Sequence, residues 1–150
     1  MIKLIRTDNT NSDFHSLVKE LDAYLKITDG DDHDFYNQYN GLEKIECVLV
    51  LYIDKEPIGC GAFKEFNSET VEIKRMYVKP TSRGTGAASK ILKRLEILAK
   101  KEGYQRCILE TGDRQVEAVR FYHKLGYVRI PNYGQYAEVT GSNCFEKILE

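Results

Sequence analysis

The chain has 150 residues, of which 42% are hydrophobic and 30% are charged, and its formal net charge is −1. This length and composition predict one globular domain over residues 1–150 with a buried core. The near-neutral charge excludes a general attraction to nucleic acid or to anionic membranes, so we expect neither as a partner. Because no apolar run approaches about 18 residues and no secretory leader opens the chain, we expect a cytoplasmic protein.

The N-terminal part of the chain predicts a strand followed by helices. Residues 2–6 form a short apolar strand, and Asn11 or Ser12 is placed to cap the helix that follows. Apolar residues recur along this helix at spacings of three and four and give it one buried face: Phe14, Leu17, Val18, Leu21, Tyr24 and Leu25. Aromatic residues at 35–39 predict a second short helix that ends at residues 40–41.

From residue 46 the pattern is that of strands joined by tight turns. We expect strands at 46–53, 58–66 and 70–79, which together make an antiparallel meander. After Pro80 the apolar period changes to about 3.6 residues and predicts a helix that Gly103 ends.

The rest of the chain alternates between strands and one helix. A strand at 107–110, a helix at 116–125 and two strands at 127–130 and 143–149 complete the order of elements. This order predicts a mixed α+β fold with helices on both faces of the sheet.

Two features could suggest a metal site, and neither has the right pattern. The cysteines are far apart and form no Cys-x-x-Cys pair, so we expect buried reduced thiols at Cys47, Cys60, Cys107 and Cys144. The acidic residues within 29–34 lack the glycine and the distal glutamate of a calcium-binding loop. We therefore expect a solvated acidic turn there and no bound metal.

A basic, glycine-containing turn between the strand at 71–78 and the following helix is the strongest chemical signal. The N-terminus of a helix presents unpaired N–H groups and a partial positive charge, both of which stabilise a phosphate. Gly84 and Gly86 can adopt positive φ and let the backbone approach a ligand, and Arg83 can hold two phosphate oxygens. The turn therefore predicts a pyrophosphate site, with a turn that merely starts a helix as the alternative.

Two motifs resemble the signatures of the GCN5-related N-acetyltransferase (GNAT) superfamily. Arg83-x-x-Gly86-x-Ala88, after a strand that ends in Met76-Tyr77-Val78, is similar to the Arg/Gln-x-x-Gly-x-Gly/Ala signature of that superfamily. Residues 115–127 resemble its second signature, in which Asn-x-x-Ala leads to a Tyr and then to Gly-Phe or Gly-Tyr. In this chain those positions hold Gln115, Ala118, Tyr122, Gly126 and Tyr127, so that Gln replaces the usual Asn.

This resemblance implies the acyl-CoA N-acyltransferase fold. Such a fold has a twisted, mostly antiparallel sheet of about seven strands flanked by four helices, with a V-shaped splay between the fourth and fifth strands. Acetyl-CoA is the implied co-substrate: it would enter the splay, pair its pantetheine with the strand backbone and place its pyrophosphate on the turn. The implied cofactor-binding residues are Met76, Tyr77, Val78, Arg83, Gly84, Thr85, Gly86, Ala87, Ala88, Gln115 and Ala118.

Acetyl transfer to an amine requires a base for the amine and an acid for the departing thiolate. Tyr122 is the candidate acid, because a phenol with an ordinary pKa of about 10 is protonated at neutral pH; a core aromatic is the alternative. Glu72 is the candidate base, directly or through a water, because strand alternation places it on one face with Lys74, Met76 and Val78. A solvated carboxylate paired with its neighbouring lysine is the alternative for Glu72, and Glu110 is the reserve base.

The acceptor is the least defined part of this prediction. The resemblance implies an enzyme that transfers acetyl to a primary amine of a small molecule or peptide by direct attack in a ternary complex, and it implies a homodimer. A loop with Tyr133 and Tyr136 either lines the acceptor pocket or packs over the end of the sheet. The alternative function is a non-catalytic acyl-CoA sensor or protein-interaction module.

Overall fold

The computed structural model describes residues 1–29 and 45–150. In chain order the elements are β1 (Ile2–Thr7), α1 (Ser12–Asp29), β2 (Cys47–Ile53), β3 (Glu56–Asn67), β4 (Thr70–Val78), η2 (Pro80–Ser82), α3 (Ala87–Lys101), β5 (Arg106–Gly112), α4 (Val116–Lys124), β6 (Val128–Ile130), η3 (Gly134–Tyr136) and β7 (Ser142–Ile148). The short helix predicted at 35–41 lies outside the described residues. The other predicted elements are confirmed, with small shifts at their ends.

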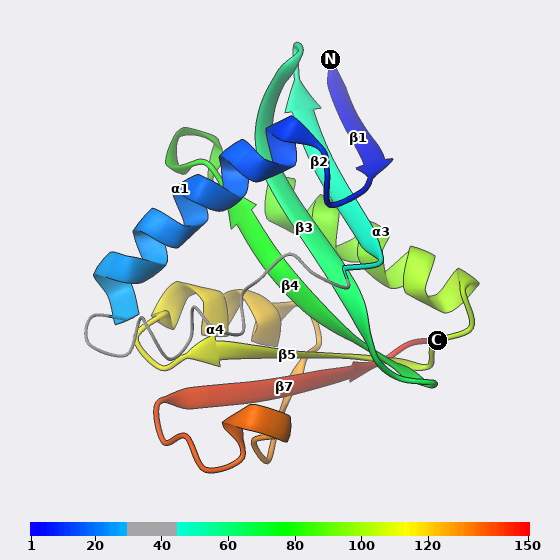
Figure 1. The fold of residues 1–150 in the computed structure, drawn as a ribbon, viewed down its shortest axis with the longest axis vertical. Coiled ribbons are helices and arrows are strands. Elements are labelled where there is room, and N and C mark those ends of the chain that lie inside the picture. The colour runs from blue at the N-terminus through cyan, green and yellow to red at the C-terminus, as the bar shows by residue number, and fades with distance from the viewer. Residues whose placement is uncertain (30–44) are drawn as a thin grey trace.

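The strands form one seven-stranded sheet in the order β1-β2-β3-β4-β5-β7-β6. Neighbouring strands are antiparallel except β4 and β5, which are parallel. This parallel pair is short, because it joins only Thr70, Val71 and Glu72 to Arg106, Cys107 and Ile108. Beyond it the two strands diverge, with α4 at the open end (Figure 1). The predicted splay between the fourth and fifth strands is confirmed.

Helices cover both faces of this sheet (Figure 1). On one face, α1 buries Phe14, Leu17 and Val18 against residues of β2 and β3. On the other, α3 buries Ile91, Leu92 and Leu95 in a larger cluster that also contains Tyr122 of α4. Within the described ranges, no helix has both the length and the apolar character that a bilayer crossing requires.

The helix boundaries follow the local signals in the sequence. The Asn11 side chain caps α1, because its Oδ1 accepts a hydrogen bond of 2.9 Å from the Phe14 N–H. After the C-terminal end of α3, Gly103 adopts φ 96°, a conformation that favours glycine and ends the helix.

A bulge interrupts the regular alternation of β4 and corrects one expectation. Ala62 pairs with Lys74 and Cys60 pairs with Tyr77, so Arg75 and Met76 lie opposite the single residue Gly61, and Arg75 has φ 58°. The extra residue reverses which face the following side chains occupy.

The prediction that Glu72 and Lys74 share a face with Met76 and Val78 is therefore wrong. Lys74 is paired with Ala62, which packs under α1, and Glu72 occupies the same face. Met76 and Val78 instead pack into the cluster beneath α3. This arrangement requires glycine at position 61, because a Cβ there would collide with Met76 Sδ and would lie 2.8 Å from Ile91 Cγ2.

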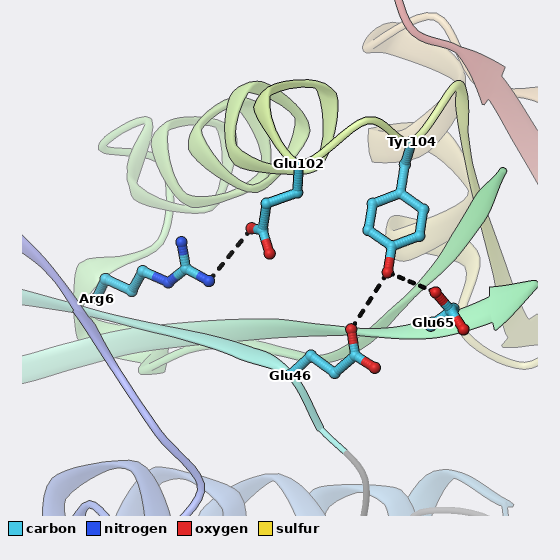
Figure 2. Close-up of polar contacts among 5 residues, drawn as sticks. All are labelled: Arg6, Glu46, Glu65, Glu102 and Tyr104. Atoms are coloured by element: carbon cyan, nitrogen blue, oxygen red, sulfur yellow. Dashed lines mark hydrogen bonds and ion pairs between the residues drawn. The ribbon is translucent and has the colours of Figure 1, made fainter. Parts of the chain in front are cut away.

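Polar contacts attach the C-terminal end of α3 to the sheet (Figure 2). The Tyr104 hydroxyl lies 2.8 Å from Oε1 of Glu65 and 3.3 Å from Oε2 of Glu46, and Arg6 Nη2 donates to Glu102 Oε2 over 3.2 Å. The hydrogen bond to Glu65 raises the pKa of Tyr104, so the phenol stays protonated as a donor.

Replacing this phenol tests its contribution to stability. We expect Tyr104→Phe to lower the free energy of unfolding by about 1 kcal/mol, because a hydrogen bond to a carboxylate is lost while the ring still packs. Urea denaturation measures the change. Tyr24→Phe is the control, since Tyr24 is 40% exposed and its hydroxyl forms no hydrogen bond with another described residue. Equal stability of Tyr104→Phe and the native chain would contradict this account.

Candidate active site

The backbone between η2 and α3 forms an open cradle of amide groups. Gly84 and Gly86 have φ 79° and 83°, and a Cβ built on either would meet no atom within 4 Å. The first hydrogen bond of α3 runs from the Lys90 N–H to the Gly86 carbonyl over 3.0 Å. The N–H groups of residues 87–89 therefore lie outside the helical hydrogen-bond ladder, at the positive end of the helix dipole. This geometry suits an anion.

Arg83 lies beside this cradle in a fixed orientation. Its Nε donates to the Val78 carbonyl over 3.0 Å, and its guanidinium lies 5.7 Å from the centre of the Tyr24 ring and 5.9 Å from that of Tyr77. Such cation–π contacts stabilise the cation and orient its plane. The sequence placed Tyr24 on the buried face of a helix; the structure places it at the cradle, because the crossing of α1 over the sheet is a tertiary feature.

A cavity of about 490 Å³ extends from the cradle to α4. All the predicted cofactor-binding residues line it except Thr85, whose hydroxyl donates to the Ser82 carbonyl over 2.6 Å. Sequence reasoning missed Phe121 of α4 and Leu125 directly after it, which also line the cavity. Their helical spacing with Ala118 was the available signal, but it also fits an ordinary core face.

One edge of β4 borders this cavity. Because the pairing with β5 ends at Glu72, no described strand pairs with that edge over residues 73–78. Met76 and Val78 line the cavity along it. Their backbone can therefore bind an extended ligand as an added strand would.

Tyr122 of α4 lies where this cavity meets a smaller one of about 110 Å³, and it lines both. Its ring packs edge-on against Phe121 and Tyr127, with centroids 5.1 and 5.6 Å away. Burial raises the pKa of Tyr122, so its phenol keeps its proton at neutral pH. No hydrogen bond joins its hydroxyl to another described residue. Tyr122 is therefore a core aromatic that also borders both cavities, and its role as the acid stays a prediction.

Glu72 lines the smaller cavity from the α1 face of the sheet. Its side chain is only 3% exposed, so the interpretation as a solvated carboxylate is wrong. The Tyr133 hydroxyl donates to its Oε2 over 2.7 Å, and the Nζ atoms of Lys64 and Lys74 each lie 3.9 Å from its Oε1. Glu110, the reserve base, lines the same cavity. The carboxylate is thus held in place by its partners and borders the smaller cavity.

The aromatic loop around η3 lies beside Glu72 and the smaller cavity. Tyr136 is buried and lines the smaller cavity, while Tyr133 packs edge-on against it and against Phe66, at 5.8 and 5.3 Å. Burial raises the pKa of Tyr133, with the neighbouring Glu72 charge adding to the effect. The loop therefore packs against the sheet and also lines the smaller cavity; that this cavity receives the acceptor stays a prediction.

The cysteines and acidic residues supply no metal centre within the described part of the chain. All four cysteines are buried free thiols, and burial raises the pKa of Cys47 to about 11 and that of Cys60 to about 12. Among the described residues, no group of three or more His, Cys, Asp or Glu side chains could hold an ion. Most of the acidic turn at 29–34 lies outside those residues.

Comparisons with known proteins agree with this geometry. The acetyltransferase (GNAT) family model matches residues 14–127. The chain is 31% identical over 135 residues to the IAA acetyltransferase of Azospirillum brasilense. The aligned region covers 89% of this chain and 88% of that protein.

Two solved structures share the fold. One is a provisionally named acyl-CoA N-acyltransferase from Klebsiella pneumoniae, with 26% identity, a TM-score of 0.84 and coverage of 100% of this chain and 99% of that one. The other is a GNAT family acetyltransferase from Elizabethkingia anophelis with acetyl-CoA bound, with 20% identity, a TM-score of 0.72 and coverage of 99% and 98%. The predicted fold is confirmed.

Proposed function

Since this chain belongs to the acetyltransferase (GNAT) family, we propose that it transfers the acetyl group of acetyl-CoA directly to a primary amine within a ternary complex. The observation that carries this proposal is the continuity of the site. An anion cradle leads into a cavity that ends at Tyr122, and a second cavity with Glu72 begins there. A thioester at the junction would have a proton donor on one side and a base on the other.

Binding of acetyl-CoA would use the features that form the larger cavity. The N–H groups of residues 87–89, with Arg83, would hold the pyrophosphate. The open edge of β4 at Met76 and Val78 would pair with the pantetheine, and Gln115 and Ala118 of α4 would cover it. The Elizabethkingia protein, which has acetyl-CoA bound, supports this because it shares the fold.

The proposed acid and base belong to opposite faces of the sheet. Tyr122 packs in the cluster that contains the buried residues of α3, while Glu72 lies on the face covered by α1. Glu72 would take a proton from the amine, and Tyr122 would give one to the departing sulfur. Because the two groups reach the junction from opposite sides of the sheet, neither blocks the other.

An acyl-CoA sensor would share the cradle and lack turnover. Release of CoA thiol during incubation with a broad panel of amines separates the two functions. Thiol release that depends on an added amine supports the transferase, and acetyl-CoA binding without any release would assign a sensor. A cytoplasmic location, a homodimer and a single domain over residues 1–150 stay predictions.

The cradle can be tested by adding a negative charge to it. Gly86→Glu should weaken acetyl-CoA binding about 100-fold or more in calorimetry, because the new carboxylate repels the pyrophosphate at the helix N-terminus. Gly103→Glu is the matched control: Gly103 also has positive φ and open space, but it lies at the other end of α3, outside the cavity. Unchanged affinity in Gly86→Glu, or equal loss in both variants, would contradict the assignment.

The role of the phenol is tested by removing only its hydroxyl. Tyr122→Phe should lower kcat by about 100-fold or more and leave the Kd of acetyl-CoA within about twofold, since the ring still lines the cavity. Tyr127→Phe is the control, because its ring contacts Tyr122 but lines neither cavity. Full turnover in Tyr122→Phe would exclude it as the acid.

The base is tested through the pH dependence of the rate. A base must lose its proton to work, so the rate of the native enzyme should fall toward low pH. Glu72→Gln should lower kcat and remove this acidic limb, whereas Glu110→Gln, on the same cavity, should retain it. The reverse pattern would transfer the role to Glu110.

A further inference from the structure

The smaller cavity is lined by charges of both signs. Its walls carry Glu72, Lys74, Arg75 and Glu110, and three of these side chains are nearly inaccessible: Lys74 is 7% exposed, Glu72 3% and Arg75 1%. Arg75 is ion-paired to Asp22 of α1, and Lys64 lies against Glu72 from β3. The four lining groups are neutral in sum, because Lys74 and Arg75 balance Glu72 and Glu110. Lys64 and Asp22 do not line the cavity, and their charges balance each other.

Lys74 is not needed to hold Glu72 in place. Glu72 already accepts a hydrogen bond from the Tyr133 hydroxyl and has Lys64 as an ionic partner. The Lys74 ammonium has three donor hydrogens, yet its ion pair with Glu72 spans 3.9 Å and no hydrogen bond joins it to another described residue. Burial lowers the pKa of Lys74, which shows that its charged form is poorly solvated here. An acceptor oxygen in the cavity would stabilise this ammonium.

A second buried donor lines the same cavity. Arg75 Nε is enclosed and has no hydrogen-bond partner among the described residues, although the same guanidinium is bound to Asp22 through Nη2. A buried donor without a partner is costly, and such groups in native proteins require an explanation. Two cationic donors, Lys74 and Arg75, thus border the space that Glu72 and Glu110 also border.

We propose that the acceptor is an amine that also carries a carboxylate, as an amino acid does, with its carboxylate at Lys74 and Arg75 and its amine at Glu72. This inference rests on the proposed function and names the acceptor class for that transfer. A molecule with both charges leaves the neutral sum of the cavity unchanged. A purely cationic amine would instead add an uncompensated charge to a buried site, which is unfavourable.

The transfer itself then balances as follows. The ammonium of the bound acceptor first gives one proton to solvent. Its neutral nitrogen then bonds to the acetyl carbonyl carbon, and the carbon–sulfur bond breaks. Glu72 takes one proton from the nitrogen, and Tyr122 supplies one to the sulfur. The products are the N-acetylated acid and the free thiol of CoA, and the carboxylate stays on Lys74 throughout.

Substrate pairs test this on the native chain, without any variant. Glycine, alanine and lysine are each compared with the corresponding amide and with the amine that lacks the carboxylate, at saturating acetyl-CoA. The rate of thiol release gives kcat/KM for each acceptor. Each value is divided by the fraction of the acceptor whose amine is neutral at the assay pH, so that differences in amine pKa do not enter the comparison. We expect at least one amino acid to exceed both of its partners by about tenfold or more, the effect of one charge-assisted contact. Equal or better use of the partners throughout would overturn the inference and leave the proposed function standing.

A pair of lysine variants assigns the preference to its residue. Lys74→Met should remove the tenfold preference, while Lys64→Met should keep it. Lys64 lies at the same 3.9 Å from Glu72, but its side chain is 31% exposed and does not line the cavity. Loss of preference in both variants, or in neither, would contradict a carboxylate site at Lys74. Failure of every amine and amino acid to release thiol would contradict the proposed function together with this inference.

Discussion

The site depends on how briefly β4 and β5 pair. Only residues Thr70–Glu72 of β4 are joined to β5, and the strands then separate. A longer ladder would have satisfied the backbone of β4 with another strand and closed the cavity that now extends from the glycine turn to α4. Because the pairing stops early, the described part of the sheet keeps an unpaired edge within its interior, and the N-terminus of α3 lies at one end of it. We propose that this interruption allows an extended, anionic ligand to bind here.

The bulge at Arg75 determines what lies on each side of the opening. One extra residue sends Met76 toward α3 and leaves Glu72 and Lys74 under α1. Tyr122 then borders the junction of the two cavities from α4, and the charged residues border it from the other face. Glu72, Lys74 and Arg75 are buried, so each would interact strongly with a ligand and each requires a partner. Their mixed signs account for the acceptor class that we infer. The apolar and aromatic lining of the larger cavity suits the pantetheine of acetyl-CoA instead.

The sequence predicted the elements well because their signals are local. Periodicity, the Asn11 cap and the glycines at the ends of α3 and α4 set helices and strands within a few residues. It failed for the faces of β4, because the bulge uses Arg75, a residue with no local preference for positive φ, and depends on the tight contact of Gly61 with α3. Likewise, spacing gave no sign that Tyr24 would stack on Arg83 or that Lys74 would be buried, since both follow from the way α1 crosses the sheet.

A crystal structure with coenzyme A bound tests the central claim most directly. The account predicts that the diphosphate accepts hydrogen bonds from the N–H groups of residues 87–89 and that the pantetheine runs along Met76 and Val78, with its sulfur near Tyr122. Coenzyme A seated outside the opening between β4 and β5, or a diphosphate distant from the start of α3, would contradict it.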